Sequence, residues 1–179
     1  MHPRLVVVIC LFLTGVMVAT LGSAVASPGS SVLVPSAAYT TAAEYSPDAE
    51  ECGFLTLINN YRAQNNRQPL TLLKTLSAPA EHHSVDMAVN NYWHDDHTLF
   101  DGTTFDQNIH NHAYAPLTVG ENILYGWNTN SSYNLTAQLA FDQWKASPSH
   151  NSNMLSSNFT AIGIGRATIV RNVSGQNRT

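Results

Sequence analysis

The chain has 179 residues, of which 44% are hydrophobic, and a formal net charge of −4. This apolar content is enough for one globular domain with a sizeable core, and the length argues against a second domain. The eight Lys and Arg residues are scattered along the chain and form no basic stripe, so nucleic acid is not an expected partner.

The N-terminus has the pattern of a secretory signal peptide over residues 1–26. Arg4 precedes an apolar run over 5–18, and the small residues Ala24 and Ala26 suit cleavage after position 26. The apolar run is shorter than the roughly 20 residues that a membrane span requires. We therefore predict a secreted, extracellular protein with no stable membrane anchor after removal of the signal.

Two cysteines limit the covalent chemistry of the chain. Cys10 lies inside the predicted signal and lacks the small residue that normally precedes a lipid-modified cysteine, so soluble secretion is preferred to a lipid anchor. Removal of the signal leaves Cys52 alone, and no internal disulfide can then form. Stability must come from packing or from a bound metal, and we expect a monomer.

Two helices are predicted early in the chain, after a leader without periodicity. Residues 27–48 are rich in Ser, Ala and Pro, which is typical of a flexible leader to a domain over 49–170. Apolar residues at helical spacing predict helices over 48–65 and 77–92. Pro79 is tolerable in the second helix because it falls in the first turn.

The second half of the chain predicts one more helix and a strand. The polar and aromatic segment 93–117 has no lasting period and predicts loops. A helix is predicted over 135–146, with Pro148 as its stop. In the final apolar run, isoleucines alternate with Gly163 and Gly165, which predicts a strand that another backbone can approach closely. We therefore expect an α+β domain with helices packed on a small antiparallel sheet.

Most of the eight histidines have an ordinary interpretation. His83 lies on the apolar face of the second predicted helix and is expected to be a satisfied core residue, while His82 is expected in solvent. His97, His110 and His112 fall in the polar segment, where a solvated surface is the simplest interpretation. A metal-binding pair of His110 and His112 stays open if strand alternation places both rings on one side.

Three further residues stand out as a set of possible ligands: His94, Glu121 and His150. They are 27 and 29 positions apart, so only the tertiary fold could bring them together. Two imidazoles and one carboxylate are ligand types that zinc takes in proteins. The alternative is a hydrogen-bonded cluster that orders the loops around a cleft.

Six motifs in a fixed order resemble the CAP superfamily, also called SCP-like or pathogenesis-related-1-like extracellular proteins, and look closest to its short bacterial-type members. The motifs span about 53–165 and read LINNYRAQNNRQPL, AEHHSVDMAVNNYWH, DG at 101–102, GENILYG, WKASPSHNSNML and FTAIGIG. Each motif alone is weak, but six in order are specific. The resemblance implies a three-layer α-β-α sandwich with a central cleft.

The resemblance also implies a metal site. Many members of the family gather two histidines and two acidic residues around a divalent metal, often zinc, and His94, Glu121 and His150 match three of these positions. Ser147 stands where fuller members carry a glutamate. The implied cofactor is therefore Zn²⁺ or another divalent cation on an incomplete ligand set.

The C-terminus departs from the resembling family. After Gly165 the family usually completes a hairpin with a final aromatic-containing strand, whereas residues 171–179 form a polar tail. The resemblance therefore implies either an exposed sheet edge or a truncated sequence.

Three classes of function are compatible with these features. The favoured class is a secreted module whose cleft captures an extracellular ligand, such as a lipid, a glycan or a protein, with or without a metal. The alternative is a metal-assisted hydrolase of peptides or esters, in which zinc lowers the pKa of bound water to about 7, although the chain shows no recognisable general base or oxyanion donors. The third is an interaction protein that uses 93–117 as a recognition surface.

Overall fold

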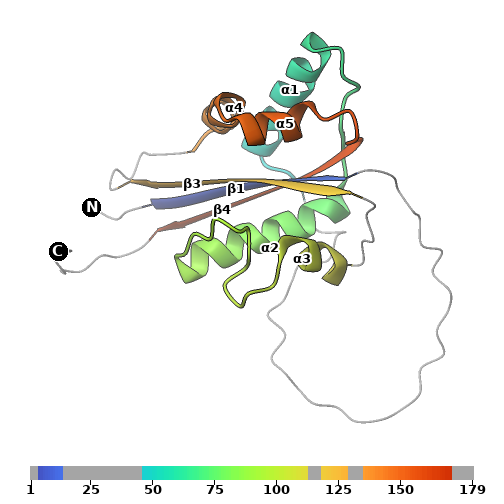
Figure 1. Cartoon of the computed structure of the whole chain (residues 1–179). Coiled ribbons are helices and arrows are strands. Elements are labelled where there is room, and N and C mark those ends of the chain that lie inside the picture. The colour runs from blue at the N-terminus through green and yellow to red at the C-terminus, as the bar shows by residue number, and fades with distance from the viewer. Residues whose placement is uncertain (1–3, 14–45, 113–117, 129–134, 171–179) are drawn as a thin grey trace, which may run out of the picture.

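The computed structural model describes residues 4–13, 46–112, 118–128 and 135–170. These residues form an α+β fold of three layers, in which helices cover both faces of one sheet (Figure 1). The class and layering predicted from the sequence are thereby confirmed. Among the described residues, none of the helices is long and apolar enough to cross a membrane.

Two predicted segments lie largely outside the described residues. The leader over 27–48 lies outside the described residues up to position 45, and the tail over 171–179 lies wholly outside them. Both stay predictions.

The sheet has the strand order β2-β4-β1-β3. Strand β1 lies antiparallel between β3 and β4, and the short β2 joins the outer side of β4 in parallel. The three long strands therefore form the antiparallel sheet that the sequence predicted. The strands are β1 (Arg4–Leu13), β2 (Thr71–Leu72), β3 (Val119–Asn128) and β4 (Ala161–Val170).

Strand β1 comes from the segment predicted to be a signal peptide. All 10 of its residues pair with β3 on one side and with β4 on the other; Val8, for example, pairs with Leu124 and with Arg166. Cleavage after Ala26 would remove this central strand, so the two roles exclude each other in one molecule. The signal peptide stays a prediction, and the structure gives the same residues a place in the sheet.

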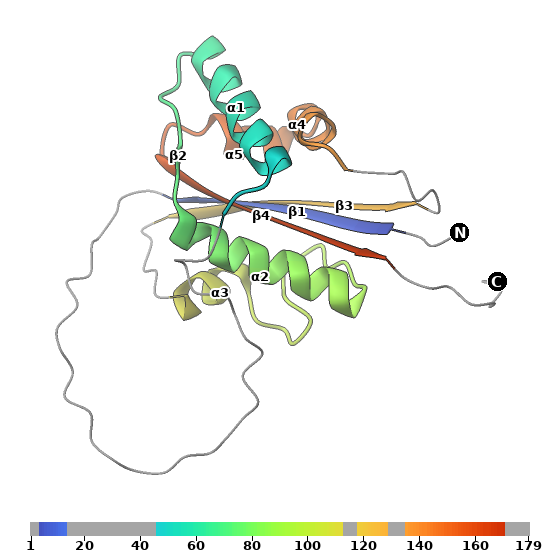
Figure 2. The same ribbon diagram turned by 180° about the vertical axis from the view of Figure 1, so that it is seen from behind.

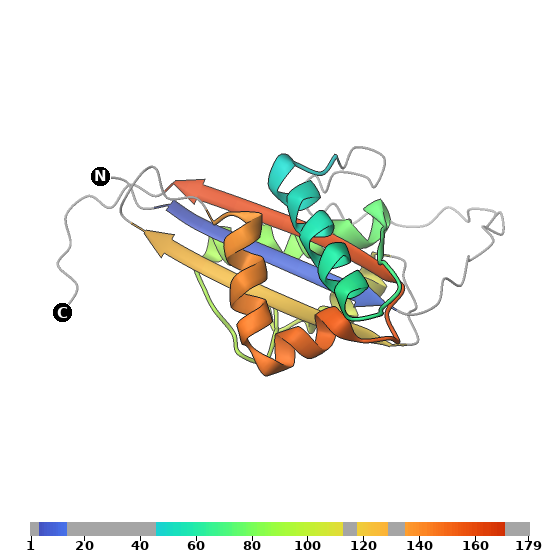
Figure 3. The same cartoon turned by 90° about the horizontal axis from the view of Figure 1, so that it is seen from above.

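Three helices cover one face of the sheet: α1 (Ala49–Gln64), α4 (Ala137–Ala146) and α5 (Pro148–Leu155) (Figure 3). Helix α1 begins after Asp48, whose carboxylate accepts a hydrogen bond from the Glu51 N–H while the Glu51 carboxylate accepts one from the Asp48 N–H. This reciprocal pair is a capping box, which satisfies two backbone donors at the helix start. It explains why the predicted boundary at residue 48 is correct.

Pro148 both ends α4 and starts α5. It occupies the first turn of α5, where its missing N–H costs little. The predicted stop of the third helix at this residue is confirmed, but α5 itself was not predicted. A proline after a helix permits either a loop or the start of a new helix, and the sequence pattern did not separate the two.

The core under these helices is built around Trp144 of α4. Its ring meets Phe54 of α1 edge to face with centroids 5.1 Å apart, a favourable aromatic geometry. Its indole N–H donates to the carbonyl of Ile123 on β3 at 3.1 Å, so the buried polar atom is satisfied. Trp144 therefore fixes α1 and α4 to the sheet at the strand that carries Glu121.

Helix α2 (Lys74–Asn90) covers the other face of the sheet (Figure 2). It begins three residues before the predicted start at residue 77, so Pro79 lies inside the helix and not in its first turn. The carbonyl of Pro79 accepts a hydrogen bond from the side chain of Asn108 at 2.9 Å. This contact joins the next helix along the chain to α2 at the proline.

The second helix of this layer, α3 (Phe105–Asn111), falls in the segment that was predicted to be loops. It starts with a second capping box, in which Thr104 and Gln107 bond each other's backbone N–H groups. With only 7 residues, the helix is too short to show an apolar period, so periodicity could not reveal it.

Helix α2 packs directly on the backbone of β4. Gly163 and Gly165 face it, and the Ser84 hydroxyl donates to the Gly165 carbonyl at 2.9 Å. The N–H of Ile164 donates to the Ser77 hydroxyl at 3.1 Å. The close backbone approach predicted at these glycines is therefore present.

Candidate functional site

The site is built on Glu121, which lies on β3 at one end of the strand order. Glu121 and its neighbour Asn122 point to opposite faces of the sheet because side chains alternate along a strand. Glu121 faces α2, and Asn122 faces α5, where its amide donates to the carbonyl of His150 at 3.1 Å. Both side chains are buried. One short strand segment therefore contacts both helical layers.

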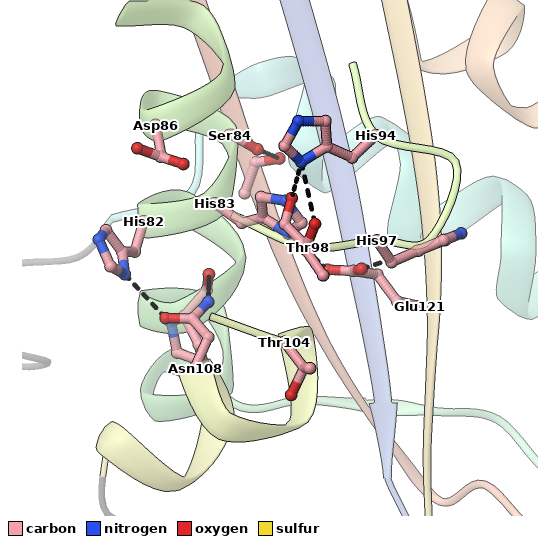
Figure 4. A network of polar contacts seen from close by, with 12 residues as sticks. His82, His83, Ser84, Asp86, His94, His97, Thr98, Thr104, Asn108 and Glu121 are labelled. Atoms are coloured by element: carbon pink, nitrogen blue, oxygen red, sulfur yellow. Dashed lines mark hydrogen bonds and ion pairs between the residues drawn. The ribbon is translucent and has the colours of Figure 1, made fainter. Parts of the chain in front are cut away.

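The carboxylate of Glu121 is held between two imidazoles (Figure 4). Its Oε1 lies 3.0 Å from Nδ1 of His83 on α2, and its Oε2 lies 2.8 Å from Nδ1 of His97 in the turn that follows α2. An ionised carboxylate only accepts hydrogen bonds, so both Nδ1 atoms carry hydrogens. In the neutral rings, Nε2 is then the nitrogen with the lone pair.

His83 is buried, as predicted, but it is not a fully satisfied core residue. Its side chain is 1% exposed, and its Nε2 is a buried atom without a hydrogen-bond partner among the described residues. Buried polar atoms without a partner are rare in folded proteins. This nitrogen is therefore a candidate acceptor for a ligand or a water.

His97 reaches Glu121 because the chain turns sharply after α2. Asn91 and His97 both adopt left-handed backbone conformations, with φ of 54° and 61°. Such conformations are uncommon outside glycine, and they bring the loop back over β3. The hydrogen bond to Glu121 raises the pKa of His97 above its ordinary value, against the opposing effect of burial.

Replacing His97 by Gln should cost more stability at about pH 6 than at about pH 8.5. The pKa of His97 is raised in the folded state, so its contribution is fully present below the ordinary value of about 6.5 and is lost as the pH rises through the folded value. Urea unfolding of both proteins across this range measures the difference.

His150→Gln provides a contrast of opposite sign. Burial, and to a smaller extent the charge of His97, lower the pKa of His150, so the native protein loses stability from this group as the pH falls through about 6.5. The variant should therefore gain stability relative to the native protein at low pH. Parallel pH profiles for native protein and His97→Gln would contradict the assigned ion pair.

The ring of His150 lies beside the cluster without joining it. Its Nδ1 is 2.9 Å from the hydroxyl of Ser147, and its ring centre is 6.4 Å from that of Trp144. Ser147, which replaces the acid expected from the resemblance, thus orients the histidine.

His94 faces Thr98, away from Glu121. Its Nδ1 lies 3.1 Å from the Thr98 carbonyl and 2.9 Å from the Thr98 hydroxyl, and its ring packs on Tyr92 with centres 4.5 Å apart. Of the predicted set, Glu121 has its carboxylate paired with His83 and His97, whereas the ring of His150 contacts Ser147 and Trp144. Metal binding by His94, Glu121 and His150 stays a prediction.

Sequence reasoning did not select His83 and His97. The pattern of α2 correctly placed His83 on the buried face, but it gave no sign that the acid of β3 would lie opposite. His97 follows His94 by three positions in the same polar stretch. Only its left-handed backbone, which periodicity cannot predict, separates it from His94.

The donor chemistry of the cluster fits a divalent cation, although its arrangement is not a closed cage. A ligating histidine usually donates its other ring N–H to a carboxylate, which is the relation of His97 to Glu121. Within the ranges that the structure describes, however, no three His, Cys, Asp or Glu side chains converge closely enough to hold a metal ion. The cluster therefore offers oriented imidazoles and not a complete coordination sphere.

The α-β-α layers are those of a CAP-type domain, and the chain belongs to the CAP family. The model of that family, described as the cysteine-rich secretory protein family, matches residues 55–172. This match confirms the resemblance read from the six motifs.

Individual relatives agree with this assignment. The uncharacterized protein YkwD of Bacillus subtilis (strain 168) is 32% identical over 126 residues, which cover 70% of this chain and 46% of the relative. The chain therefore spans less than half the length of this curated relative.

A solved structure shows the same fold. A crystal structure of an extracellular protein containing a SCP domain from Bacillus anthracis str. Ames matches with a TM-score of 0.56 and 24% identity, over 68% of this chain and 40% of that chain. An outer surface protein from Borrelia burgdorferi matches more weakly, with a TM-score of 0.48 and 19% identity, over 71% and 96% of the two chains.

Proposed function

We propose that this chain is an extracellular ligand-binding module of the CAP family, and that its ligand site is the cluster of Glu121, His83 and His97 with His150 beside it. The extracellular SCP-domain protein of Bacillus anthracis supports the location.

The observation that carries the proposal is a buried carboxylate whose side-chain partners in the described part of the chain are two imidazoles. Burying a charge is costly unless it is paired and hydrogen-bonded. Among the described residues, Glu121, which is 5% exposed, is paired with the imidazoles of His83 and His97 and not with an Arg or Lys. Groups of this kind gather at functional sites more often than at structural ones.

A divalent cation is the simplest ligand for this site. Glu121 holds the Nδ1–H of His97, so the Nε2 lone pair of that ring is available in a fixed orientation. In this proposal His150, whose ring Ser147 orients through Nδ1, supplies the second imidazole. Glu121 orients His97, which binds the cation, and His94 takes no part.

Zinc titration of the full chain by calorimetry tests the site. His97→Ala should lower zinc affinity at least about tenfold, and Glu121→Gln should lower it by about 10–100-fold, because an outer carboxylate fixes the orientation and basicity of the ligating ring. His94→Ala should change it by less than about twofold, the level expected for a residue outside the coordination sphere.

The same three variants separate the proposal from its rivals. If His94→Ala weakens zinc binding more than His97→Ala, the site is assembled as the sequence predicted and not as the geometry indicates. If none of the three changes zinc affinity, the cluster orders the fold and does not bind a cation. Circular dichroism of each variant confirms that it is folded.

A further inference from the structure

The large apolar side chains that the described residues expose to solvent are gathered in one short stretch. Val85 is 41% exposed, Val89 56%, Trp93 44% and Phe100 58%. The two valines lie on α2, and the two aromatic residues lie in the segment that connects α2 to α3. Scattered exposed apolar residues are ordinary, whereas those that gather on one surface mark interaction sites.

The carboxylate of Asp86 joins Phe100 to the exposed side of α2. The N–H of Phe100 donates to its Oδ2 at 2.8 Å, and the hydroxyl of Tyr92 donates to the same oxygen at 2.6 Å. The rings of Tyr92 and Phe100 pack with centres 5.7 Å apart. On α2, Val89 is three positions from Asp86 and four from Val85, so the three side chains share one side of the helix. Phe100 is therefore held against the turn of α2 that exposes the two valines.

Phe100 and Asp101 form the tip of a hydrogen-bonded turn. The N–H of Leu99 donates to the carbonyl of Thr103 at 2.8 Å, and the N–H of Gly102 donates to the carbonyl of Leu99 at 2.9 Å. Leu99 is 3% exposed, so the turn is fastened to the core below it. The backbone that carries Phe100 is thus fixed before a partner arrives, which lowers the entropic cost of binding.

The same part of the chain carries a negative charge that no basic residue offsets. Residues 75–112 contain six acidic residues and no Lys or Arg, whereas the other residues contain eight Lys and Arg and six acids. Asp95, Asp96 and Asp101 are exposed between α2 and α3. These two helices lie together on one face of the sheet (Figure 2), so the charge and the exposed apolar side chains share one layer of the molecule.

A partner for this surface must combine positive charge with apolar side chains. Nucleic acids and anionic lipid headgroups have the wrong sign of charge and would be repelled. A basic segment with apolar residues on one side matches both features. Its Lys or Arg side chains can pair with the carboxylates, while its apolar residues cover the ring of Phe100.

We propose that Val85, Val89 and Phe100, together with the carboxylates of Asp86 and Asp101, form a docking surface for a basic, amphipathic peptide segment of a partner protein. Phe100 is the apolar anchor, and the two carboxylates select a cationic partner. This docking surface does not include the Glu121 cluster and does not depend on the function proposed for that cluster.

Fluorescence anisotropy of a labelled peptide with the full chain tests the docking surface. The probe is a synthetic peptide of Lys and Leu only, about 14 residues long, with every Leu on one side of a helix. Phe100→Ser should lower its affinity at least about tenfold, because a few aromatic anchors supply most of the binding energy of an interface. The same peptide with Glu in place of every Lys should bind at least about tenfold more weakly, because it offers the same apolar side with the opposite charge.

Asp101→Asn and Asp142→Asn are a matched pair that tests the charge. Both carboxylates are exposed, and an amide oxygen can still accept the hydrogen bond that each receives, from the Thr103 N–H and from the Gln138 side chain. Asp142 lies on α4, on the opposite face of the sheet. Asp101→Asn should weaken binding about threefold at about 0.02 M salt and less at about 0.3 M, whereas Asp142→Asn should change it by less than about 1.5-fold.

Three results would overturn the docking surface. The Glu peptide could bind as tightly as the Lys peptide, Phe100→Ser could leave the affinity unchanged, or Asp142→Asn could cause the same loss as Asp101→Asn. Val85→Ser decides the case if Phe100→Ser disturbs the turn, because Val85 lies on α2 and its loss should also weaken binding, by about threefold.

Sedimentation with phosphatidylcholine vesicles separates a lipid surface from a peptide. We expect no association of the chain with these vesicles, because they offer apolar surface without net positive charge. Association that Phe100→Ser abolishes, in a protein that does not bind the Lys peptide, would assign the surface to a membrane and overturn the proposal.

Discussion

Replacing Arg62 by Met should lower the free energy of unfolding by about 3–5 kcal/mol. Arg62 is 1% exposed and has no carboxylate partner among its hydrogen bonds in the described residues. Met matches the length of the side chain but has no donor, so buried carbonyls lose their partners, at about 1–3 kcal/mol each before relaxation. The guanidinium donates to the carbonyls of Gln68, Met154, Ser156 and Phe159 at 2.7, 2.7, 3.0 and 3.2 Å.

Two variants control this prediction. Arg62→Lys keeps the charge but not the planar guanidinium, so its free energy of unfolding should lie between those of Arg62→Met and the native protein. Arg67→Met removes an exposed cation five positions away and should change stability by no more than about 0.5 kcal/mol. Urea denaturation measures all three, with an unchanged slope as the sign that stability alone has changed. A loss below about 1 kcal/mol for Arg62→Met would mean that the carbonyls find other partners.

Arg62 also positions the candidate site from a distance. It holds the end of α5 and the turn that leads into β4, and α5 in turn carries Asn153. The amide of Asn153 donates to the backbone carbonyl of Glu121 at 3.3 Å and to the Asn122 side chain at 2.8 Å. Arg62 thus affects the site indirectly, because its hydrogen bonds fix α5, the helix that lies against β3.

The elements that the sequence predicted well are those with a strong local signal. The helix from residue 48 has both an apolar stripe and a capping box, and the helix over 135–146 has a stripe and a proline after it. Helix α3 has only its capping box, in Thr104 and Gln107, which a search for periodicity passes over. Short helices are set by their caps and by tertiary contacts, so their prediction needs those signals first.

The site could be predicted only in part because its members meet through the tertiary fold. Glu121 follows Gly120 in a motif of the family, so the sequence identified the acid. Which imidazoles reach it depends on the face of α2 and on a left-handed turn at His97. The pattern of α2 predicts that His83 is buried but not that Glu121 lies opposite it, and the path of the loop leaves no periodic trace in the sequence. His94 and His97 are the same residue type, but His97 has a left-handed backbone and contacts Glu121, whereas His94 contacts Thr98.

Strand β1 shows a different limit of sequence reasoning. A short apolar run after a positive charge satisfies the pattern of a signal peptide and equally that of a strand buried between two others. Arg4–Leu13 meets both descriptions, and its place between β3 and β4 follows only from pairing across more than a hundred residues. Composition alone cannot choose between two roles that require the same apolar residues.

Replacing Gly165 by Ala should lower the free energy of unfolding by at least about 3 kcal/mol or prevent folding altogether. A Cβ at this position would overlap the backbone nitrogen of Glu81 and the carbonyl carbon of Ala80 in α2. These atoms belong to a helix backbone and cannot turn aside as a side chain can, so α2 must move away from β4. Gly163→Ala should act similarly, because its Cβ would overlap the backbone of Leu76.

Gly53→Ala is the matched control for Gly165→Ala, and it should raise stability by about 0.5–1 kcal/mol. Gly53 lies inside α1, and a Cβ there would meet the Cβ of Ala137 at 3.4 Å, an ordinary contact. Thermal unfolding of the two variants separates a steric effect from a general effect of replacing glycine by alanine. A Gly165→Ala protein as stable as the native one would show that the backbone of α2 does not approach β4 as closely as the structure indicates.

The depth of α2 also determines the geometry of the candidate site. His83 lies on α2 between Ala80, which packs against Gly165, and Ser84, whose hydroxyl bonds the Gly165 carbonyl. The 3.0 Å contact of His83 with Glu121 therefore depends on the same close approach that the glycines permit. Any Gly165→Ala protein that folds should show a weakened His83–Glu121 contact, seen as changed chemical shifts of the His83 ring by NMR. Unchanged chemical shifts of the His83 ring in such a protein would show that the packing of α2 on β4 does not determine the geometry of the site.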